Sequence, residues 1–171
     1  SVLHSTAFAG IETSFRLIAV KDTRNDEIVG CIRITPASEL FDIPSSREEY
    51  HLDVFDKKQL AQLSVLTRLA VLKPYRKTPA SIVLMAYAFI EWLKEGGKAT
   101  LMSCEPNLLP LYKKLGLRTL GYMHNSPSGG YRLPMICLPD KAHLKSVRSP
   151  GLSLLKEVKW DEHKDICDWY N

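Results

Sequence analysis

The stretch LTRLAVLKPYRKTPASIVLM (66–85) contains an apolar run, a basic turn and the start of a second apolar run. The first run, within 64–73, is apolar almost throughout, which predicts a central strand covered on both faces. In the second run, apolar residues recur at helical spacing from Ile82 to Leu93, so we expect a helix over 79–95 that ends at the two glycines that follow. A strand that leads through a turn into a helix presents free backbone N–H groups, which favour an anion.

The turn between the two runs carries positive charge and hydroxyl groups but no glycine. Glycine allows a phosphate to approach the backbone closely, whereas the proline here removes one N–H donor and stiffens the turn. One interpretation is a narrow cradle for a phosphate group. The alternative is an ordinary helix start, in which Thr78 caps the helix, Pro79 lies in its first turn and the charges are solvated. The residues of the candidate cradle are Arg76, Lys77, Thr78, Pro79, Ala80 and Ser81.

The rest of the chain alternates between strand and helix patterns. We expect a hairpin over 15–37, then a long polar stretch (38–59) that holds a short helix and contributes to function. Further strands are expected at 98–104, 117–125 and 131–139, a short helix at 107–116, and a helix within 152–170. This order predicts one α/β (α+β) domain over 1–171, with a core at about 15–140 and a helical tail at 141–171.

Composition excludes several classes of protein. The net charge of +4 over 171 residues is too small to indicate nucleic-acid binding, although it suits an anionic ligand or an acidic partner. No apolar run has the length of about 20 residues that a membrane-spanning helix needs, and the first ten residues lack the pattern of a signal peptide. The four cysteines form no CxxC pair and no histidines have metal-ligand spacing, so we expect no metal and a cytoplasmic protein with free thiols.

Two candidate catalytic residues follow the strand expected at 98–104. Glu105 lies at the carboxyl end of that strand, where ligands collect in α/β sheets, and a carboxylate there can take a proton from an amine. Tyr112 lies in the following short helix and can protonate a leaving thiolate. The alternatives are that Glu105 caps that helix and that Tyr112 is a core aromatic residue.

Two arginines interrupt apolar strands. Arg33 lies in GCIRIT and Arg68 lies in LTRLAV, and a charge in such a strand needs a partner if it is buried. They either lie on an exposed strand face or bind a carboxylate or carbonyl group of a substrate.

The segments LAVLKPYRKTPASIVLM and ATLMSCEPNLLPLYKKLGL resemble, in order and separation, those of the GNAT acyltransferase superfamily. The resemblance implies a mixed, mostly antiparallel central sheet with helices on both faces. It implies that the strand backbone at Leu69 and Val71 pairs with pantetheine and that the turn at 76–81 holds the donor's phosphates. That turn keeps the family's arginine, Arg76, and lacks its two glycines. The segment LYKKLGL places Tyr112 at the family's usual general-acid tyrosine.

Within that superfamily, GCIRITP and LTRLAV are similar to segments of the acyl-homoserine-lactone synthases and long-chain N-acyl amino acid synthases. Arg33 and Arg68 match the two arginines of that branch, whereas its glutamate falls at Val65, so either Glu105 acts as the base or the amine arrives deprotonated. The resemblance implies transfer of an acyl group, expected to be long, from acyl carrier protein or acyl-CoA to the amine of an amino-acid-like acceptor. A tethered phosphopantetheine needs fewer phosphate contacts than coenzyme A and more basic surface for the acidic carrier protein.

Two other functions are compatible with these residues. One is an ordinary acetyl-CoA-dependent N-acetyltransferase. The other is a non-catalytic module that binds an acyl group or another ligand on the same fold, which the valine at position 65 and the absent glycines favour.

Overall fold

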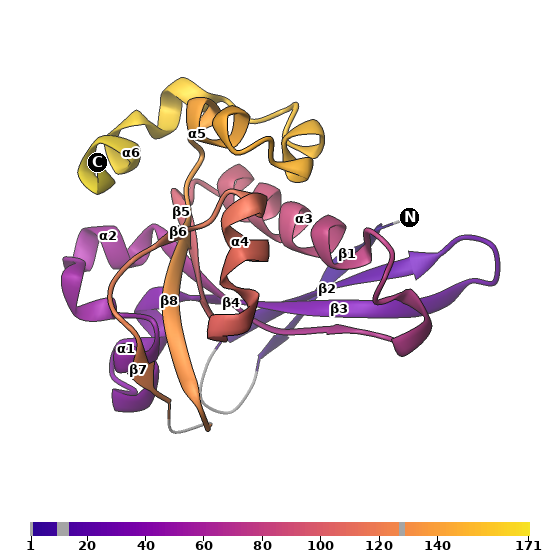
Figure 1. Ribbon diagram of the computed structural model, residues 1–171, viewed down its shortest axis with the longest axis horizontal. Helices are drawn as coiled ribbons and strands as arrows, with labels where there is room; N and C mark the ends of the chain where they lie inside the picture. Colours follow the sequence, from indigo (N-terminus) through magenta and orange to yellow (C-terminus); the bar gives the residue numbers. More distant parts are fainter. Residues whose placement is uncertain (1, 10–13, 127–128) are drawn as a thin grey trace.

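The structure is a computed structural model that describes residues 2–9, 14–126 and 129–171 (Figure 1). Its centre is a sheet with the strand order β1-β2-β3-β4-β5-β8-β6, and β7 also pairs with β8. Neighbouring strands are antiparallel except β4 and β5, which are parallel. The strands are β1 (Val2–Ala9), β2 (Ser14–Asp22), β3 (Glu27–Pro36), β4 (Leu63–Val71), β5 (Ala99–Cys104), β6 (Arg118–Thr119), β7 (His124–Asn125) and β8 (Tyr131–Cys137). The mixed, mostly antiparallel sheet expected from the sequence is confirmed.

Helices connect the strands. The α-helices are α1 (Pro44–Glu49), α2 (Lys57–Ala61), α3 (Ala80–Lys94), α4 (Leu109–Leu115), α5 (Lys141–Ser146) and α6 (Lys164–Tyr170). Short 3-10 helices are η1 (Ala37–Leu40), η2 (Leu52–Val54), η3 (Lys73–Tyr75), η4 (Pro106–Leu108), η5 (Pro150–Leu154) and η6 (Trp160–His163). No helix in the described ranges is long and apolar enough to cross a membrane.

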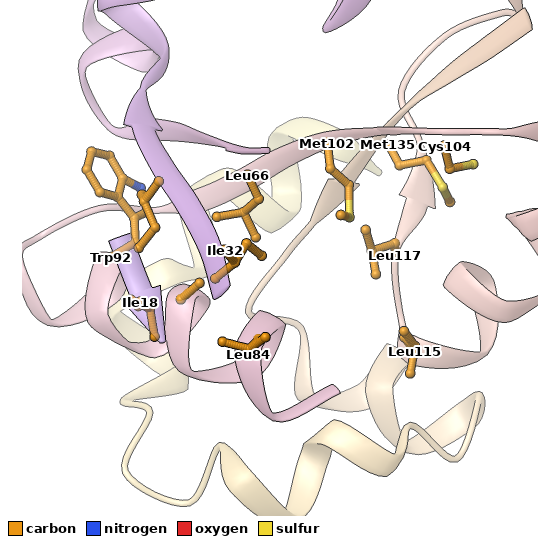
Figure 2. Packing of buried hydrophobic residues seen from close by; sticks show 12 residues of the cluster. Ile18, Ile32, Leu66, Leu84, Trp92, Met102, Cys104, Leu115, Leu117 and Met135 are labelled. Carbon is orange, nitrogen blue, oxygen red and sulfur yellow. The ribbon is translucent and has the colours of Figure 1, made fainter. Parts of the chain in front are cut away.

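Two buried clusters cover the two faces of the sheet. On one face α3 packs through Leu84 and Trp92, and Figure 2 shows these side chains with sheet residues of the same cluster, among them Ile18, Ile32 and Leu66. On the other face the segment from η1 to α2, together with α6, covers a second cluster, whose sheet residues include Leu63, Val65 and Leu101. Because β4 contributes Leu63 and Val65 to one cluster and Leu66 to the other, it is a central strand buried on both faces, as its composition predicts.

A β-bulge interrupts the pairing of β3 with β4. Cys31 pairs with Ala70 and Arg33 pairs with Thr67, so β4 uses one residue more than β3 over this interval. Arg68 lies in the bulge with a φ of +51°, a left-handed conformation that costs a non-glycine residue free energy. The bulge coincides with a change in the burial of β4. The first four residues of the strand are buried, and its later residues alternate between partly buried and exposed.

Several local expectations need correction. The helix expected within 152–170 is broken into η5, η6 and α6, because the tail spreads Leu155 and Val158 over α3 instead of forming one apolar stripe. The strand expected over 117–125 consists only of β6 and β7, since the backbone between them turns away. The polar stretch 38–59 contains several short helices and not one. The tail itself lies at the top of the view in Figure 1, next to α3.

Candidate active site

The cleft forms where β4 and β5 separate. The two strands pair from Leu63 with Ala99 to Val65 with Leu101, and within the described residues the pairing stops there. Beyond this point the strands enclose an open cleft of about 320 Å³. Its walls come from β4, β5, α1, α4 and β8 and comprise Glu49, Tyr50, Leu66, Thr67, Arg68, Leu69, Met102, Ser103, Cys104, Glu105, Leu108, Tyr112 and Arg132. The structure thus brings together four residues that the sequence singled out: Arg68, Leu69, Glu105 and Tyr112.

The two arginines of the apolar strands have different surroundings. Arg68 lines the cleft and is exposed, because the bulge turns it out of the strand. Arg33 is partly buried; its Nε donates a hydrogen bond to Thr67 Oγ1 at 2.8 Å and its guanidinium lies 5.5 Å from the ring centre of Phe15. Burial, followed by the charge of Arg68, lowers the pKa of Arg33. Arg33 is therefore hydrogen-bonded to the bulged strand across the ladder, and Arg68 presents the positive charge to the cleft.

Glu105 lies at the mouth of the cleft in an ion pair. Its Oε1 is 2.8 Å from Nη1 of Arg132, and its side chain is 51% exposed while that of Arg132 is 22% exposed. Glu105 occupies the N-cap position of η4, but its side chain makes no capping hydrogen bond. The carboxylate therefore lies where the helix dipole favours a negative charge but makes no capping bond, and it is paired with a guanidinium from β8.

Tyr112 lies in α4 and faces the cleft, with part of its ring packed against the first buried cluster. Burial raises the pKa of the Tyr112 hydroxyl, and the nearby Cys104 and Glu105 raise it further. A tyrosine hydroxyl is protonated at neutral pH with or without this shift, so it carries the proton that a donor needs. Tyr112 thus packs partly against the core and also lines the cleft, and the transfer of its proton to a thiolate stays a prediction.

Glu49 and Tyr50 were not singled out from the sequence, although they belong to the polar stretch that was expected to contribute to function. Glu49 is the last residue of α1, and its Oε1 and Oε2 accept hydrogen bonds from Ser103 Oγ at 2.7 Å and Ser126 Oγ at 2.9 Å. Burial, followed by the charge of Glu49, raises the pKa of Tyr50 to about 12. No local sequence signal identifies these residues, because the partners of Glu49 lie 54 and 77 residues away.

The turn at 76–81 lies outside the cleft walls, between η3 and α3. Thr78 Oγ1 donates to the Tyr75 carbonyl at 2.7 Å and accepts from the Ala80 N–H at 3.3 Å, while Arg76 Nε donates to the Val71 carbonyl at 3.1 Å. The N-cap residue of α3 is Pro79 and not Thr78, although Thr78 Oγ1 accepts a hydrogen bond from the first N–H of the helix. Arg76 and Lys77 are exposed, and Ser81 lies in the first turn of α3.

An apolar pocket adjoins the cleft on the side of α3 and α4. Leu66 and Met102 line both the cleft and this pocket, so the two spaces share these side chains. The pocket measures about 50 Å³. Its other walls include Ile82, Met85, Ala86 and Phe89 of α3, Leu115 of α4, and Leu144 and Leu155 of the tail.

Comparisons with known proteins support the fold. No protein-family model matches the sequence, and no curated protein matches it. The solved structures that match include the CoA-dependent acyl-homoserine lactone synthase MesI, with a TM-score of 0.59, 17% identity and coverage of 78% of this chain and 67% of that one. The CoA-dependent acyl-homoserine lactone synthase BjaI, solved with SAM and isopentyl-CoA, matches with a TM-score of 0.59 at 14% identity over 80% of this chain and 65% of that one.

A third match is an aminoglycoside 6'-N-acetyltransferase complexed with coenzyme A, with a TM-score of 0.50, 17% identity and coverage of 72% of both chains. At these identities the likeness concerns the fold. The chain therefore has the GNAT fold, and acyl-homoserine lactone synthases are among its structural neighbours.

Proposed function

We propose that the protein is an N-acyltransferase, in which an amine attacks the carbonyl carbon of an acyl thioester. A C–N bond forms, the C–S bond breaks, the nitrogen loses a proton and the sulfur gains one. The observation that carries this proposal is the cleft between β4 and β5, since a bulged strand, an arginine and a protonated tyrosine converge there within the GNAT fold. The neighbours MesI and BjaI support acyl transfer to an amine as the class of reaction.

The donor is proposed to lie along β4. Where β5 has moved away, the backbone of β4 at Leu69 and Val71 can pair with the amide groups of pantetheine, as when a peptide adds to a sheet edge. The Val71 carbonyl already accepts a hydrogen bond from Arg76 Nε and has a second lone pair for the donor. A backbone N–H of this strand can also polarise the thioester carbonyl. The donor's phosphate is assigned to the start of α3, where free N–H groups, Arg76 and Lys77 favour an anion.

The identity of the donor is the finer part of the proposal. The turn at 76–81 uses Thr78 for its own hydrogen bonds and has no glycine, so it offers a phosphate fewer contacts than the family's glycine-containing turn. This favours a carrier-protein donor with a single tethered phosphate over coenzyme A. The exposed Lys73, Arg76 and Lys77 supply basic surface for an acidic carrier protein.

The acyl chain is assigned to the apolar pocket beyond Leu66 and Met102. At about 10–15 Å³ for each water-sized group, the 50 Å³ of the pocket holds about four such groups. A donor with a chain longer than acetyl fits this space. A long chain needs further room, which the flexible side chains of Met85 and Met102 can provide by changing rotamer. In the alternative, an enzyme that uses acetyl-CoA as its donor leaves this pocket unused.

The acceptor is proposed to be an amino-acid-like amine. Arg68 supplies a guanidinium for its carboxylate or carbonyl group, and Arg33 holds the strand that carries Arg68. Tyr112 then protonates the leaving thiolate. Glu105 is a weaker candidate for the base than the sequence indicates, because Arg132 already neutralises it at the surface.

One observation favours the non-catalytic alternative. Val65, which occupies the position of the related synthases' glutamate, is fully buried in the second cluster and cannot serve a reacting group. The test is to incubate the protein with acyl-CoA and acyl carrier protein donors of increasing chain length and a panel of amino acids, and to detect the amide by mass spectrometry. An amide that requires both substrates and the protein supports the enzyme; ligand retention without any amide supports the binding module.

A further inference from the structure

Glu49 is the one carboxylate of the cleft that the proposed reaction has not used. It reaches the cleft from α1, whereas Arg68 reaches it from β4, and its two oxygens each accept one hydroxyl hydrogen bond. We propose that Glu49 binds the ammonium group of the acceptor and takes its proton. The inference rests on the proposed N-acyltransferase function and assigns a base at a position other than the one that the resemblance to the lactone synthases implies.

The hydrogen bonds of Glu49 leave room for a cation. A carboxylate has about four lone-pair positions, and Ser103 and Ser126 use one on each oxygen. The remaining positions can accept from an ammonium group in the cleft. The two serines come from β5 and from the segment after β7, so elements other than α1 hold the carboxylate in its orientation.

The charge of Glu49 is not compensated by an ion pair among the residues that the structure describes. Glu105, by contrast, is paired with Arg132. A carboxylate in the last turn of a helix is also opposed by the helix dipole, so helix stability does not explain why a glutamate stands there. An unpaired anion beside an open cleft suits a cationic group of the ligand.

The cleft therefore presents separated charges of both signs. Arg68 on β4 is exposed and matches a carboxylate, while Glu49 on α1 matches an ammonium group. A zwitterionic amino acid carries both groups, which supports that acceptor class. The arrangement also accounts for Val65: the carboxylate that is missing from β4 is supplied from a different element on the same cleft.

The proton transfer balances as follows. The acceptor enters as an ammonium ion, Glu49 takes one proton, and the free amine attacks the thioester carbonyl. The C–N bond forms, the C–S bond breaks, and Tyr112 gives its proton to the sulfur. The nitrogen loses its second proton as the tetrahedral intermediate collapses, and this proton restores the Tyr112 hydroxyl through solvent in the cleft. The carboxylic acid of Glu49 then returns the first proton to bulk water.

The first experiment measures binding and does not depend on turnover. Wild-type protein is titrated by calorimetry with L-leucine and L-tyrosine and with the matching acids that lack the amine, 4-methylpentanoate and 3-(4-hydroxyphenyl)propanoate. We expect at least one amino acid to bind about tenfold more tightly than its matching acid. Glu49→Gln should abolish that difference, because it keeps an acceptor for the serines and loses the charge. Glu48→Gln removes a neighbouring exposed charge and should change nothing.

The second experiment follows the rate against pH in the same variants. The titratable and charged groups that face the cleft with Glu49 are Tyr50, Arg68, Cys104, Glu105, Tyr112 and Arg132. In Glu49→Gln we expect kcat to fall about 10² to 10³-fold at neutral pH and to recover as pH rises, since each unit raises the fraction of free amine tenfold. Glu48→Gln should keep the wild-type pH profile, and the melting temperature of Glu49→Gln should stay near that of wild type.

The outcomes separate the two proposals. If wild type prefers the amino acids and Glu49→Gln does not, the ammonium site stands even if no donor supports turnover, and the proposed function alone is wrong. If Glu49→Gln keeps the preference, or wild type shows none, the assignment of Glu49 is overturned. A loss of rate without a change in the pH profile also overturns it, because that result indicates that Glu49 only braces α1.

Discussion

Val65 pairs with Leu101, and in the described sheet this is the last pair that joins β4 to β5. Before it the strands share the buried core; after it they separate, and the cleft with Arg68 and Tyr112 opens between them. The bulge at Arg68 follows within three residues of Val65, so the same short segment ends the parallel pairing and turns a charged side chain toward the cleft. The predictions below start from that segment.

Replacing Arg68 separates backbone strain from chemistry. Arg68 has a φ of +51°, which glycine adopts freely and alanine does not. We expect Arg68→Gly to be more stable than Arg68→Ala by about 0.5–1 kcal/mol. Both variants lose the guanidinium, so both should weaken acceptor binding by the same factor, about tenfold or more. Thermal denaturation and acceptor titration measure the two effects; acceptor affinity that survives in both variants contradicts the role of Arg68.

Tyr112→Phe tests the proton donor. The ring packs against the first cluster, so phenylalanine keeps the core contact and removes only the hydroxyl. We expect kcat to fall about 10² to 10⁴-fold, the range for general acid–base catalysis, with little change in donor affinity. Steady-state kinetics at varied donor concentration distinguish a change in kcat from a change in donor affinity. A change confined to KM shows that the hydroxyl binds the donor and does not transfer a proton.

Ala86 controls the acyl pocket. It is 9% exposed and lines the apolar space that Leu66 and Met102 share with the cleft. Ala86→Leu should fill part of this space and shorten the longest acyl chain that is transferred, at a cost in stability of about 1–3 kcal/mol. Exposed Ala61, on α2, provides the control Ala61→Leu, which should leave chain preference unchanged. An unchanged chain-length profile in Ala86→Leu places the acyl chain elsewhere.

Tyr50 gives the fold a pH dependence in the alkaline range. Burial, with the charge of Glu49, raises the pKa of Tyr50 from 10.0 to about 12 in the folded state. A raised pKa contributes stability that is complete below the pKa of the unfolded chain and is lost as pH rises through the folded value. The free energy of unfolding should therefore fall by roughly 2–3 kcal/mol between pH 10 and about 12 from this group.

The matched variant is Tyr50→Phe, which has no hydroxyl to ionise. Chemical denaturation at stepped pH should show a flatter profile for Tyr50→Phe than for wild type over the same interval. Parallel profiles would mean that the hydroxyl is not held in its neutral form by the fold.

Much of the fold can be predicted from local sequence signals. The apolar stripe of α3 and the glycine after α4 define those helices, and Gly116, with a φ of +104°, ends α4 where expected. The run around Leu66 is recognisable as a central strand because its residues on both faces are apolar. These signals are strong because each depends on residues within one element.

The parts that could not be predicted depend on contacts between distant segments. The bulge at Arg68 has no local signal, since arginine is not a residue that favours the left-handed region. Glu49 lies in a helix of six residues and gains its place in the cleft from Ser103 and Ser126. The pairing of Glu105 with Arg132 likewise joins the end of β5 to β8, and it changed the base assignment that the sequence favours.

The most direct test of the central claim is the rate of thiol release from an acyl donor, measured with and without an amino-acid acceptor. Wild-type protein should release thiol from acyl carrier protein or acyl-CoA in proportion to the amount of amide formed, and Tyr112→Phe should reduce both together. Absence of amine-dependent thiol release with every donor, from a protein that is folded by circular dichroism, would contradict the account.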